Sequence, residues 1–206
     1  MTPSIEVVAF DFGGVLVDWD PRHLYRSLFE DDAAMEDFLA TVCTSEWNDR
    51  LDRGRPFAEG VAELVERFPD QAELITAYHE RWPEMVRGEI DGTVGVLDEL
   101  RAAGVPTYVL SNASAETWPH AVERFPFLSR FDGVLLSGEV GVAKPDPEIF
   151  DELCRRFDLR PGSTIFIDDR AVNVDAARTL GFTAHHFTGA EALRVELVAL
   201  GLLPPA

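Results

Sequence analysis

Residues 5–14, IEVVAFDFGG, place an acid and two glycines directly after an apolar run, and the fold and function of the whole chain are interpreted from this junction. The run at 5–10 is mostly β-branched and aromatic, which is typical of a buried β-strand. Asp11 ends the run, and Gly13-Gly14 let the backbone turn and approach a ligand closely. Asp11 is therefore expected to project from a sheet end as a nucleophile or a metal ligand, with a turn cap as the alternative.

Runs of the same character recur along the chain and alternate with helical patterns. The predicted strands are at 5–10, 105–110, 163–167 and 182–187, with 133–136 as a weaker member. Apolar residues three and four positions apart predict helices at 93–104, 147–159 and 172–181. This alternation predicts an α/β fold, a Rossmann-like three-layer domain with a mostly parallel sheet.

The stretch at about 20–87 breaks the alternation and offers only helical windows, such as 56–69 and 71–86. It is predicted to be a small helical unit inserted after the first strand. The expected organisation is a Rossmann-like core of residues 1–19 and 88–206 with the inserted unit at 20–87.

The net charge of the chain argues against two classes of binding partner, nucleic acids and membranes. The 206 residues include 18 Lys plus Arg and 37 Asp plus Glu, a formal charge of −19. Such a field repels nucleic acid and anionic lipid, so neither nucleic acid nor membrane is expected as a partner. The same field repels a small phosphorylated substrate, which would need a local positive centre to bind.

The cysteines and the N-terminal sequence indicate the cellular compartment in which the protein is expected. Cys43 and Cys154 are 111 positions apart without CxxC spacing, which favours buried thiols in a reducing compartment over a disulfide. The first residues lack a secretory pattern, and no apolar run approaches a membrane span. A cytoplasmic location is expected, and the sequence leaves open whether the protein is a monomer or a dimer.

Two polar pairs, Asp168-Asp169 and Ser111-Asn112, follow predicted strands. Asp168-Asp169 repel each other unless a cation lies near, and together with Asp11 they would form an oxygen site suited to Mg²⁺. Alternatively, Asp169 only caps the helix that begins near Ala171. Ser111-Asn112 offer groups for a phosphoryl oxygen or, alternatively, an ordinary helix cap.

Lys144 is the only lysine in the chain and stands beside a proline before a predicted helix. All other basic side chains are arginine, so a lone lysine at a rigid position indicates a placed point charge for phosphate. A chance surface position is the alternative.

The order of these residues resembles the haloacid dehalogenase superfamily. Its four motifs correspond to D-x-G-G-V-L at 11–16, S-N at 111–112, K-P at 144–145 and D-D-x-x-x-N at 168–173. The resemblance covers nearly the whole chain. It implies a phosphatase on a small phosphorylated metabolite, with Mg²⁺ as cofactor and a helical cap at the position of the insertion.

The resemblance also implies roles for single residues. Asp11 would attack phosphorus and form an aspartyl phosphate. Mg²⁺ would be held by the Asp11 carboxylate, the Gly13 carbonyl and the Asp168-Asp169 pair, with Asp169 as the more direct ligand.

The transferring phosphoryl group would bind to four positions, namely Gly13, Ser111, Asn112 and Lys144. Ser111 and Lys144 would stabilise its charge, while Asn112 assists. Asn173 would order the loop around the metal.

One residue departs from the family pattern. Typical family phosphatases carry a second Asp, the general acid and base, two residues after the nucleophile, and this chain has Gly13 there. The departure is similar to the opening of sugar-1-phosphate phosphatases and of the phosphatase domain of epoxide hydrolases, which suggests a sugar phosphate as substrate. Asp18 and Asp20 are candidates for the missing acid, and cap residues Arg22, Trp47, Arg50, Arg53 and Arg55 are candidates for facing the site.

Two alternatives share the Gly13 departure. A 2-haloacid dehalogenase would use Asp11 on carbon without metal, but such enzymes do not keep the acidic pair that this chain retains. A silent module that binds a phosphorylated ligand is a hypothesis of another class, and retention of Asp11, Lys144 and Asp168-Asp169 is evidence against it.

Overall fold

The computed structural model describes residues 4–205 and contains a five-stranded sheet with the order β5-β4-β1-β6-β7. All four strand pairs are parallel. The strands are β1 (Val7–Phe10), β4 (Thr107–Ser111), β5 (Gly133–Leu136), β6 (Thr164–Asp168) and β7 (Thr183–His186). The predicted α/β class and all five predicted strands are confirmed.

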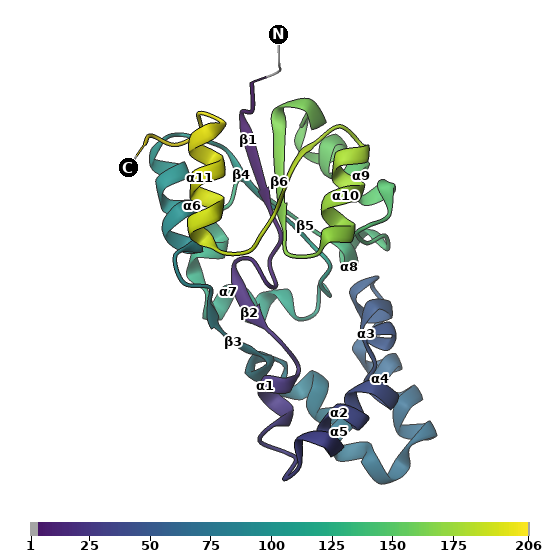
Figure 1. Ribbon diagram of the computed structural model, residues 1–206. Coiled ribbons are helices and arrows are strands. Elements are labelled where there is room, and N and C mark those ends of the chain that lie inside the picture. The colour runs from purple at the N-terminus through teal and green to yellow at the C-terminus, as the bar shows by residue number, and fades with distance from the viewer. Residues whose placement is uncertain (1–3, 206) are drawn as a thin grey trace.

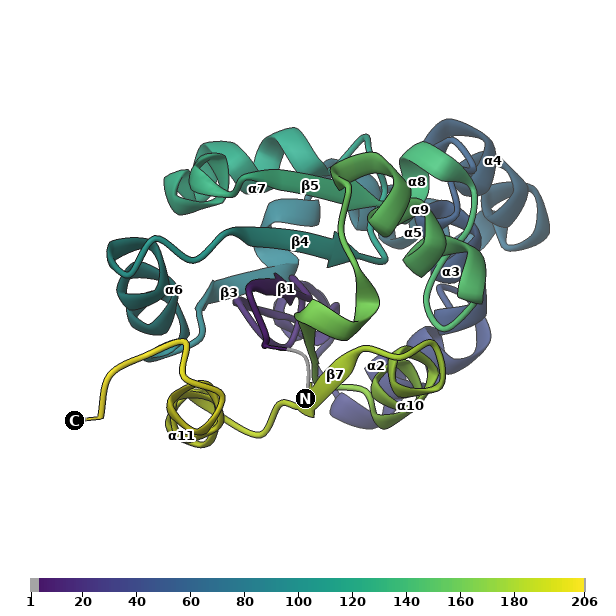
Figure 2. The ribbon, with the colours of Figure 1, turned by 90° about the horizontal axis from the view of Figure 1, so that it is seen from above.

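Helices cover both faces of the sheet and complete the three layers (Figures 1 and 2). One face carries α6 (Thr93–Ala102), α7 (Trp118–Arg124) and α11 (Ala190–Ala199), and the other carries α9 (Pro147–Phe157) and α10 (Ala171–Thr179). Shorter elements are α8 (Ser137–Val140) and the 3-10 helices η3 (Pro126–Arg130) and η4 (Pro161–Ser163). None of the helices within residues 4–205 has the length and apolar character to cross a bilayer.

Alternation along each strand divides the core into two apolar clusters, one for each face. Val8 and Phe10 of β1 belong to the cluster beneath α6 and α11, whereas Ala9 belongs to the cluster beneath α9 and α10. β1 lies between β4 and β6 and is covered on both faces, which explains why all of its residues are apolar.

The register brings the polar ends of the central strands to one edge. Phe10 of β1 pairs with Val109 of β4 and with Ile167 of β6. Asp11 therefore leaves the sheet beside the ends of its two neighbours, which are Ser111 and Asp168. Ligands of open parallel sheets bind at this edge.

The segment between the first two core strands of the sequence lies beyond this edge (Figure 1). It begins and ends in a two-stranded antiparallel ribbon of β2 (Val17–Trp19) and β3 (Val86–Glu89). Its helices are α1 (Arg22–Tyr25), α2 (Asp32–Thr41), α3 (Ser45–Asp52), α4 (Phe57–Arg67) and α5 (Ala72–Glu80), with the 3-10 helices η1 (Pro69–Gln71) and η2 (Trp82–Met85). We propose that residues 20–87 act as a cap on the remaining core.

Local sequence explains where the cap helices begin and how they pack. The Thr44 hydroxyl accepts a hydrogen bond from the Trp47 amide at 3.1 Å and caps α3. The buried Trp47 indole donates to the Gly60 carbonyl at 3.1 Å, and a Cβ at Gly60 would lie 2.6 Å from Leu51. The predicted helical window at 71–86 was too long, because α5 ends at Glu80 and Pro83 follows in η2.

The apolar core beneath α9 gives a test of this packing. Leu153 on α9 is fully buried, so replacement with Ala should lower the free energy of unfolding by about 2–5 kcal/mol. Urea unfolding monitored by circular dichroism measures the change. Val195→Ala on α11 is the control, because Val195 is 66% exposed and should shift stability by less than about 0.5 kcal/mol. Equal effects of the two changes would contradict the packing.

Candidate active site

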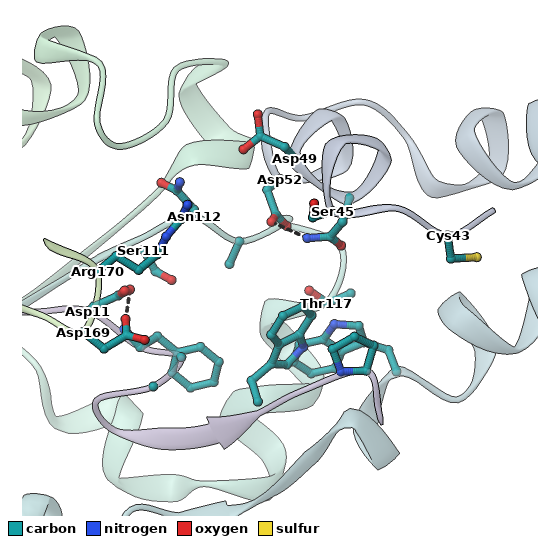
Figure 3. Close-up of a pocket in the computed structure, with 18 of the residues that line it drawn as sticks. Asp11, Cys43, Ser45, Asp49, Asp52, Ser111, Asn112, Thr117, Asp169 and Arg170 are labelled. Atoms are coloured by element: carbon teal, nitrogen blue, oxygen red, sulfur yellow. Dashed lines mark hydrogen bonds between the residues drawn. The ribbon is translucent and has the colours of Figure 1, made fainter. Parts of the chain in front are cut away.

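A cavity of about 530 Å³ lies between the sheet edge and the cap. The core contributes lining residues from each of the predicted motifs, namely Asp11, Gly13, Ser111, Asn112, Lys144, Asp169 and Asn173. The cap and ribbon contribute Trp19, Arg22, Leu39, Cys43, Ser45, Asn48, Asp49, Asp52, Tyr78 and Trp82, among others. Figure 3 shows Asp11, Ser111, Asn112 and Asp169 on one side of the cavity and Cys43, Ser45, Asp49 and Asp52 on the other.

The centre of the core wall is a buried ammonium between two buried carboxylates. Lys144 Nζ lies 2.8 Å from Asp11 Oδ1 and 2.8 Å from Asp168 Oδ2. It also donates to the Leu110 carbonyl at 2.9 Å. The three groups come from different segments, so Lys144 is a placed charge and not a surface residue.

Asp168 organises the loop that follows β6. Its Oδ1 accepts from the Arg170 amide at 2.8 Å, and Asn173 Nδ2 lies 3.0 Å from each of its oxygens. The N-cap residue of α10 is Arg170 and no side chain caps this helix, so the alternative role of Asp169 as a helix cap is not observed. Asn173 orders this loop through Asp168.

The charges in this group shift one another's protonation. Burial raises the pKa of Asp11, the Lys144 ammonium opposes that shift, and the Asp168 and Asp169 charges add to it. Burial disfavours the Lys144 ammonium, but the Asp11 and Asp168 carboxylates outweigh burial and raise the pKa of Lys144. Lys144 is therefore charged at neutral pH.

Asp169 is exposed and differs from Asp168 in its surroundings. Figure 3 shows its carboxyl group facing that of Asp11. Burial, followed by the Asp168 charge, raises the pKa of Asp169. Gly14, at φ +75°, passes so close to Asp169 that a Cβ there would lie 2.5 Å from Oδ2. The glycine turn is therefore required for this carboxylate to reach the site.

The acidic group has the composition of a divalent-cation site. Asp11, Asp168 and Asp169 each place one carboxylate oxygen so that all three lie within 4.8 Å of one another. Three carboxylates face one ammonium, which leaves an excess of negative charge. Asn173 Oδ1 is buried and has no hydrogen-bond partner among residues 4–205, and a metal-bound water would satisfy it. Such oxygen-rich groups suit Mg²⁺.

Ser111 and Asn112 both line the cavity at the end of β4. Asn112 Nδ2 donates to the Lys144 carbonyl at 2.8 Å, and the Lys144 amide donates to Asn112 Oδ1 at 2.8 Å. This reciprocal pair ties the Lys144 loop to β4. The observed contacts of Asn112 thus position the lysine, while Ser111 has its hydroxyl at the cavity wall.

Gly13 lines the cavity at the position where a second acid would stand. The two acids considered as substitutes are engaged elsewhere. Asp18 Oδ1 lies 3.0 Å from His23 Nε2, and Asp20 Oδ1 accepts from the Arg22 amide at 2.8 Å. Neither is among the residues that line the cavity.

Of the five cap residues considered from sequence, Arg22 alone is among the lining residues. Trp47 packs inside the cap. The other three arginines form ion pairs, Arg50 and Arg55 with Glu63, and Arg53 with Asp49 and Asp146.

The sequence analysis missed the polar face of α3. Ser45, Asn48, Asp49 and Asp52 all line the cavity, at the spacing of one helix face. That spacing was readable in the sequence, but α3 itself was not predicted as a separate helix. Burial, followed by the Asp49 charge, raises the pKa of Asp52 to about 8.

Comparison with known proteins finds hydrolases, several of them phosphatases, that are similar to this chain. Residues 5–181 match the model of a haloacid dehalogenase-like hydrolase family. The sesquiterpene phosphatase astK of Aspergillus oryzae is 28% identical over 198 residues, 96% of this chain and 97% of that protein. The D-ribitol-5-phosphate phosphatase of Bacteroides thetaiotaomicron is 25% identical over 207 residues, 95% and 98% of the two chains. The (S)-2-haloacid dehalogenase 1 of Pseudomonas sp. is 31% identical over 121 residues, only 58% of this chain and 50% of that protein.

Solved structures show the same fold. A HAD family enzyme, bt-2542, from Bacteroides thetaiotaomicron superposes with a TM-score of 0.73 at 22% identity, covering 95% of this chain and 99% of that chain. A magnesium complex of that enzyme has a TM-score of 0.70 at 21% identity, covering 91% and 95% of the two chains.

The buried ion group predicts a pH-dependent stability. Lys144→Met should lower the free energy of unfolding by about 3–5 kcal/mol at pH 7, because it leaves two buried carboxylates uncompensated. Burial already raises the pKa of Asp11 to about 7 with Lys144 present, and removal of the opposing ammonium raises it further, so the folded variant takes up a proton at a higher pH than the wild type does. The loss should therefore shrink as pH falls from about 9 toward 7. Urea unfolding in EDTA at several pH values measures it, and a loss independent of pH would contradict the assignment.

The carboxylate group predicts metal-dependent stability. Mg²⁺ at 100 times its dissociation constant should stabilise the protein by about 2.7 kcal/mol, seen as a higher Tm. Asp169→Asn should weaken this response, because it removes the exposed carboxylate beside Asp11. Asp175→Asn on α10, which lies outside the group, is the matched control and should keep the full shift. An identical Mg²⁺ response in both variants would exclude Asp169 as a ligand.

Proposed function

Because the chain belongs to the haloacid dehalogenase-like hydrolase family, we propose that it hydrolyses a small phosphorylated metabolite through an aspartyl phosphate on Asp11, with Mg²⁺ as cofactor. The observation that carries the proposal is the contact of Lys144 with Asp11 and the buried Asp168, with Asp169 beside them, where Asp11, Lys144 and Asp169 line the cavity. This arrangement combines a nucleophile, a fixed positive charge and a set of metal ligands.

The contacts of Asp11 suit it to nucleophilic attack. Its Oδ1 accepts from the Phe12 amide at 2.7 Å and lies 2.8 Å from Lys144 Nζ. These two donors fix the carboxyl plane, and Oδ2 is then the oxygen that attacks phosphorus. The attack splits one difficult displacement into formation and hydrolysis of a covalent intermediate.

Asp11, the Gly13 carbonyl, Asp168 and Asp169 would hold the Mg²⁺. When bound, the cation neutralises negative charge on the phosphoryl group and allows an anionic ester to approach the carboxylates. Asp168 already accepts four hydrogen-bond contacts from Lys144, Asn173 and Arg170, whereas Asp169 is exposed. This difference supports Asp169 as the more direct ligand.

Lys144 and Ser111 would stabilise the charge on the transferring phosphoryl oxygens. Lys144 is held in place by Asp168, by the Leu110 carbonyl and by the Asn112 side chain, so it needs little reorganisation during reaction. Gly13 and Asn112 complete the wall around the phosphoryl group.

The cap side of the cavity supports a sugar-like leaving group. α3 offers hydroxyl, amide and carboxyl groups from Ser45, Asn48 and Asp52. The ribbon and neighbouring helices offer apolar surfaces from Trp19 and Trp82. Polar groups and aromatic surfaces in one cavity fit a molecule with hydroxyl groups along a carbon skeleton, and the relative named as a D-ribitol-5-phosphate phosphatase is consistent with such a substrate.

The retained acidic group argues against the dehalogenase alternative. A 2-haloacid is a carboxylate, and Asp11, Asp168 and Asp169 together would repel it without a neutralising cation. A phosphate ester brought in with Mg²⁺ does not meet this repulsion.

Removal of the nucleophile tests the proposal. Asp11→Asn should reduce phosphate release from phosphomonoesters by roughly 10⁴- to 10⁶-fold, because no covalent intermediate can form. The assay measures inorganic phosphate with Mg²⁺ over a panel of sugar phosphates, polyol phosphates, nucleotides and a prenyl phosphate, and EDTA should abolish the wild-type activity.

Two further outcomes of these assays would establish one of the alternative functions. Metal-independent chloride release from 2-chloropropionate would establish a dehalogenase instead. Binding of a phosphorylated compound without turnover of any substrate would establish a silent module.

A further inference from the structure

We propose that Asp52, on cap helix α3, is the catalytic acid and base that takes the place of the aspartate missing at position 13. This inference rests on the proposed function, because it assigns the proton transfers of the same phosphatase reaction. Asp52 lies 41 positions from Asp11 in the sequence and reaches the site only through the fold of the cap.

The direction of the reaction places the proton donor on the cap side. In phosphoryl transfer, the attacking and leaving oxygens lie roughly in line on opposite sides of phosphorus. Asp11 attacks from the sheet edge, so the leaving oxygen points across the cavity toward the cap. Figure 3 shows the Asp52 side chain projecting into the cavity from α3, on the other side from Asp11 and Asp169.

The other cap groups that line the cavity are poor proton donors. The Glu36 carboxylate is held by Arg22 Nε and Nη2, which lowers the pKa of Glu36. Burial raises the pKa of Cys43 to about 12, and burial also raises the pKa of Tyr78 well above its ordinary value. The Asp49 carboxylate accepts from Arg53 Nε at 3.0 Å.

Hydrogen bonds hold the Asp52 carboxyl group in a fixed orientation at the cavity wall. Tyr78 OH donates to Asn48 Oδ1 at 2.9 Å, which turns Asn48 Nδ2 toward Asp52 Oδ2 at 2.7 Å. This chain, together with the Ser114 amide, fixes the orientation of the carboxyl group.

The groups around Asp52 favour its protonated form at neutral pH. Burial and the nearby Asp49 charge raise its pKa, the Asn48 side chain and the Ser114 amide oppose the rise, and Asp11 across the cavity adds to it. The adjacent cation, Arg53 at the end of α3, forms ion pairs with Asp49 and Asp146. A carboxyl that is protonated near neutral pH suits a general acid.

The backbone of Asp52 is anchored to the core. Ser137 Oγ donates to the Asp52 carbonyl at 2.5 Å, and Arg53 Nη1 lies 2.6 Å from Asp146 Oδ2. Gly54, at φ +93°, approaches so closely that a Cβ would lie 2.8 Å from the Gly138 carbonyl oxygen. These contacts set the distance between α3 and the sheet edge, so Asp52 is in place only while the cap lies on the core.

The proton transfers balance over the two half-reactions. As Asp11 bonds to phosphorus, the bond from phosphorus to the leaving oxygen breaks, and that oxygen takes the Asp52 proton to leave as an alcohol. The Asp52 carboxylate then takes a proton from the water that attacks the aspartyl phosphate. Inorganic phosphate leaves, and the Asp11 carboxylate and protonated Asp52 are restored.

The test compares leaving groups in the presence of Mg²⁺. An alkyl ester such as a polyol phosphate needs a proton on its leaving oxygen, whereas p-nitrophenyl phosphate releases a stable phenolate without one. Asp52→Asn should lower kcat/KM for the alkyl ester by about 10²- to 10⁴-fold and leave kcat/KM for the aryl ester within a few fold. Because kcat/KM reports formation of the phosphoenzyme, slow dephosphorylation of the variant does not affect the comparison.

Matched variants separate catalysis from structure. Glu46→Gln removes one negative charge from an exposed position of the same helix, outside the cavity, and should leave the ratio of alkyl to aryl kcat/KM unchanged. Asp52→Ala is a second variant of the proposed acid. The anchor to the core uses the Asp52 backbone, so Asp52→Asn and Asp52→Ala should both keep the wild-type Tm within a few degrees.

The outcomes distinguish the inference from the proposed function. Equal losses on both esters, or no loss on either, would overturn the role of Asp52 while wild-type turnover still supports the phosphatase. A wild-type protein that releases phosphate from neither ester would overturn the proposed function and this role with it.

Discussion

The contact on which the site depends is the buried ammonium of Lys144 between Asp11 and Asp168. Both carboxylates end strands that are buried on two faces, so neither can be charged there at low cost without a cation. One lysine serves both, and it reaches them because Asn112 clamps its backbone to β4. The strand order and register therefore bring two buried carboxylates together, and the fold needs the Lys144 charge to compensate them.

Much of the core was predictable from sequence because strand and helix periodicities are local signals. β1, β4 and β6 end at the polar residues that the apolar runs indicate, and parallel pairing brings Asp11, Ser111 and Asp168 together. The loop contacts were not predictable to the same degree. That Asp168 contacts Lys144 while Asp169 lines the cavity is decided by side-chain direction after the strand, which the two adjacent aspartates do not reveal.

The cap was harder to predict because its residues act through tertiary contacts. The arginines that sequence suggested for the site form ion pairs within the cap or with the core, and Arg22 alone among them lines the cavity. The polar face of α3 is ordinary in composition, and tertiary contacts turn it toward the sheet edge, through Trp47 packing on Tyr78 within the cap and the Ser137 hydrogen bond to the core. Sequence located the insertion, whereas the fold decides which of its faces meets the substrate.

A separate consequence follows from the lysine count. Lys144 is the only lysine in the chain, and its ammonium is buried beneath the cap. Reagents that modify side-chain amines therefore have one target in this protein, and that target lies inside the cavity. With an acylating reagent that reacts faster than the cap closes, the rate of labelling at Lys144 equals the rate at which the cap opens.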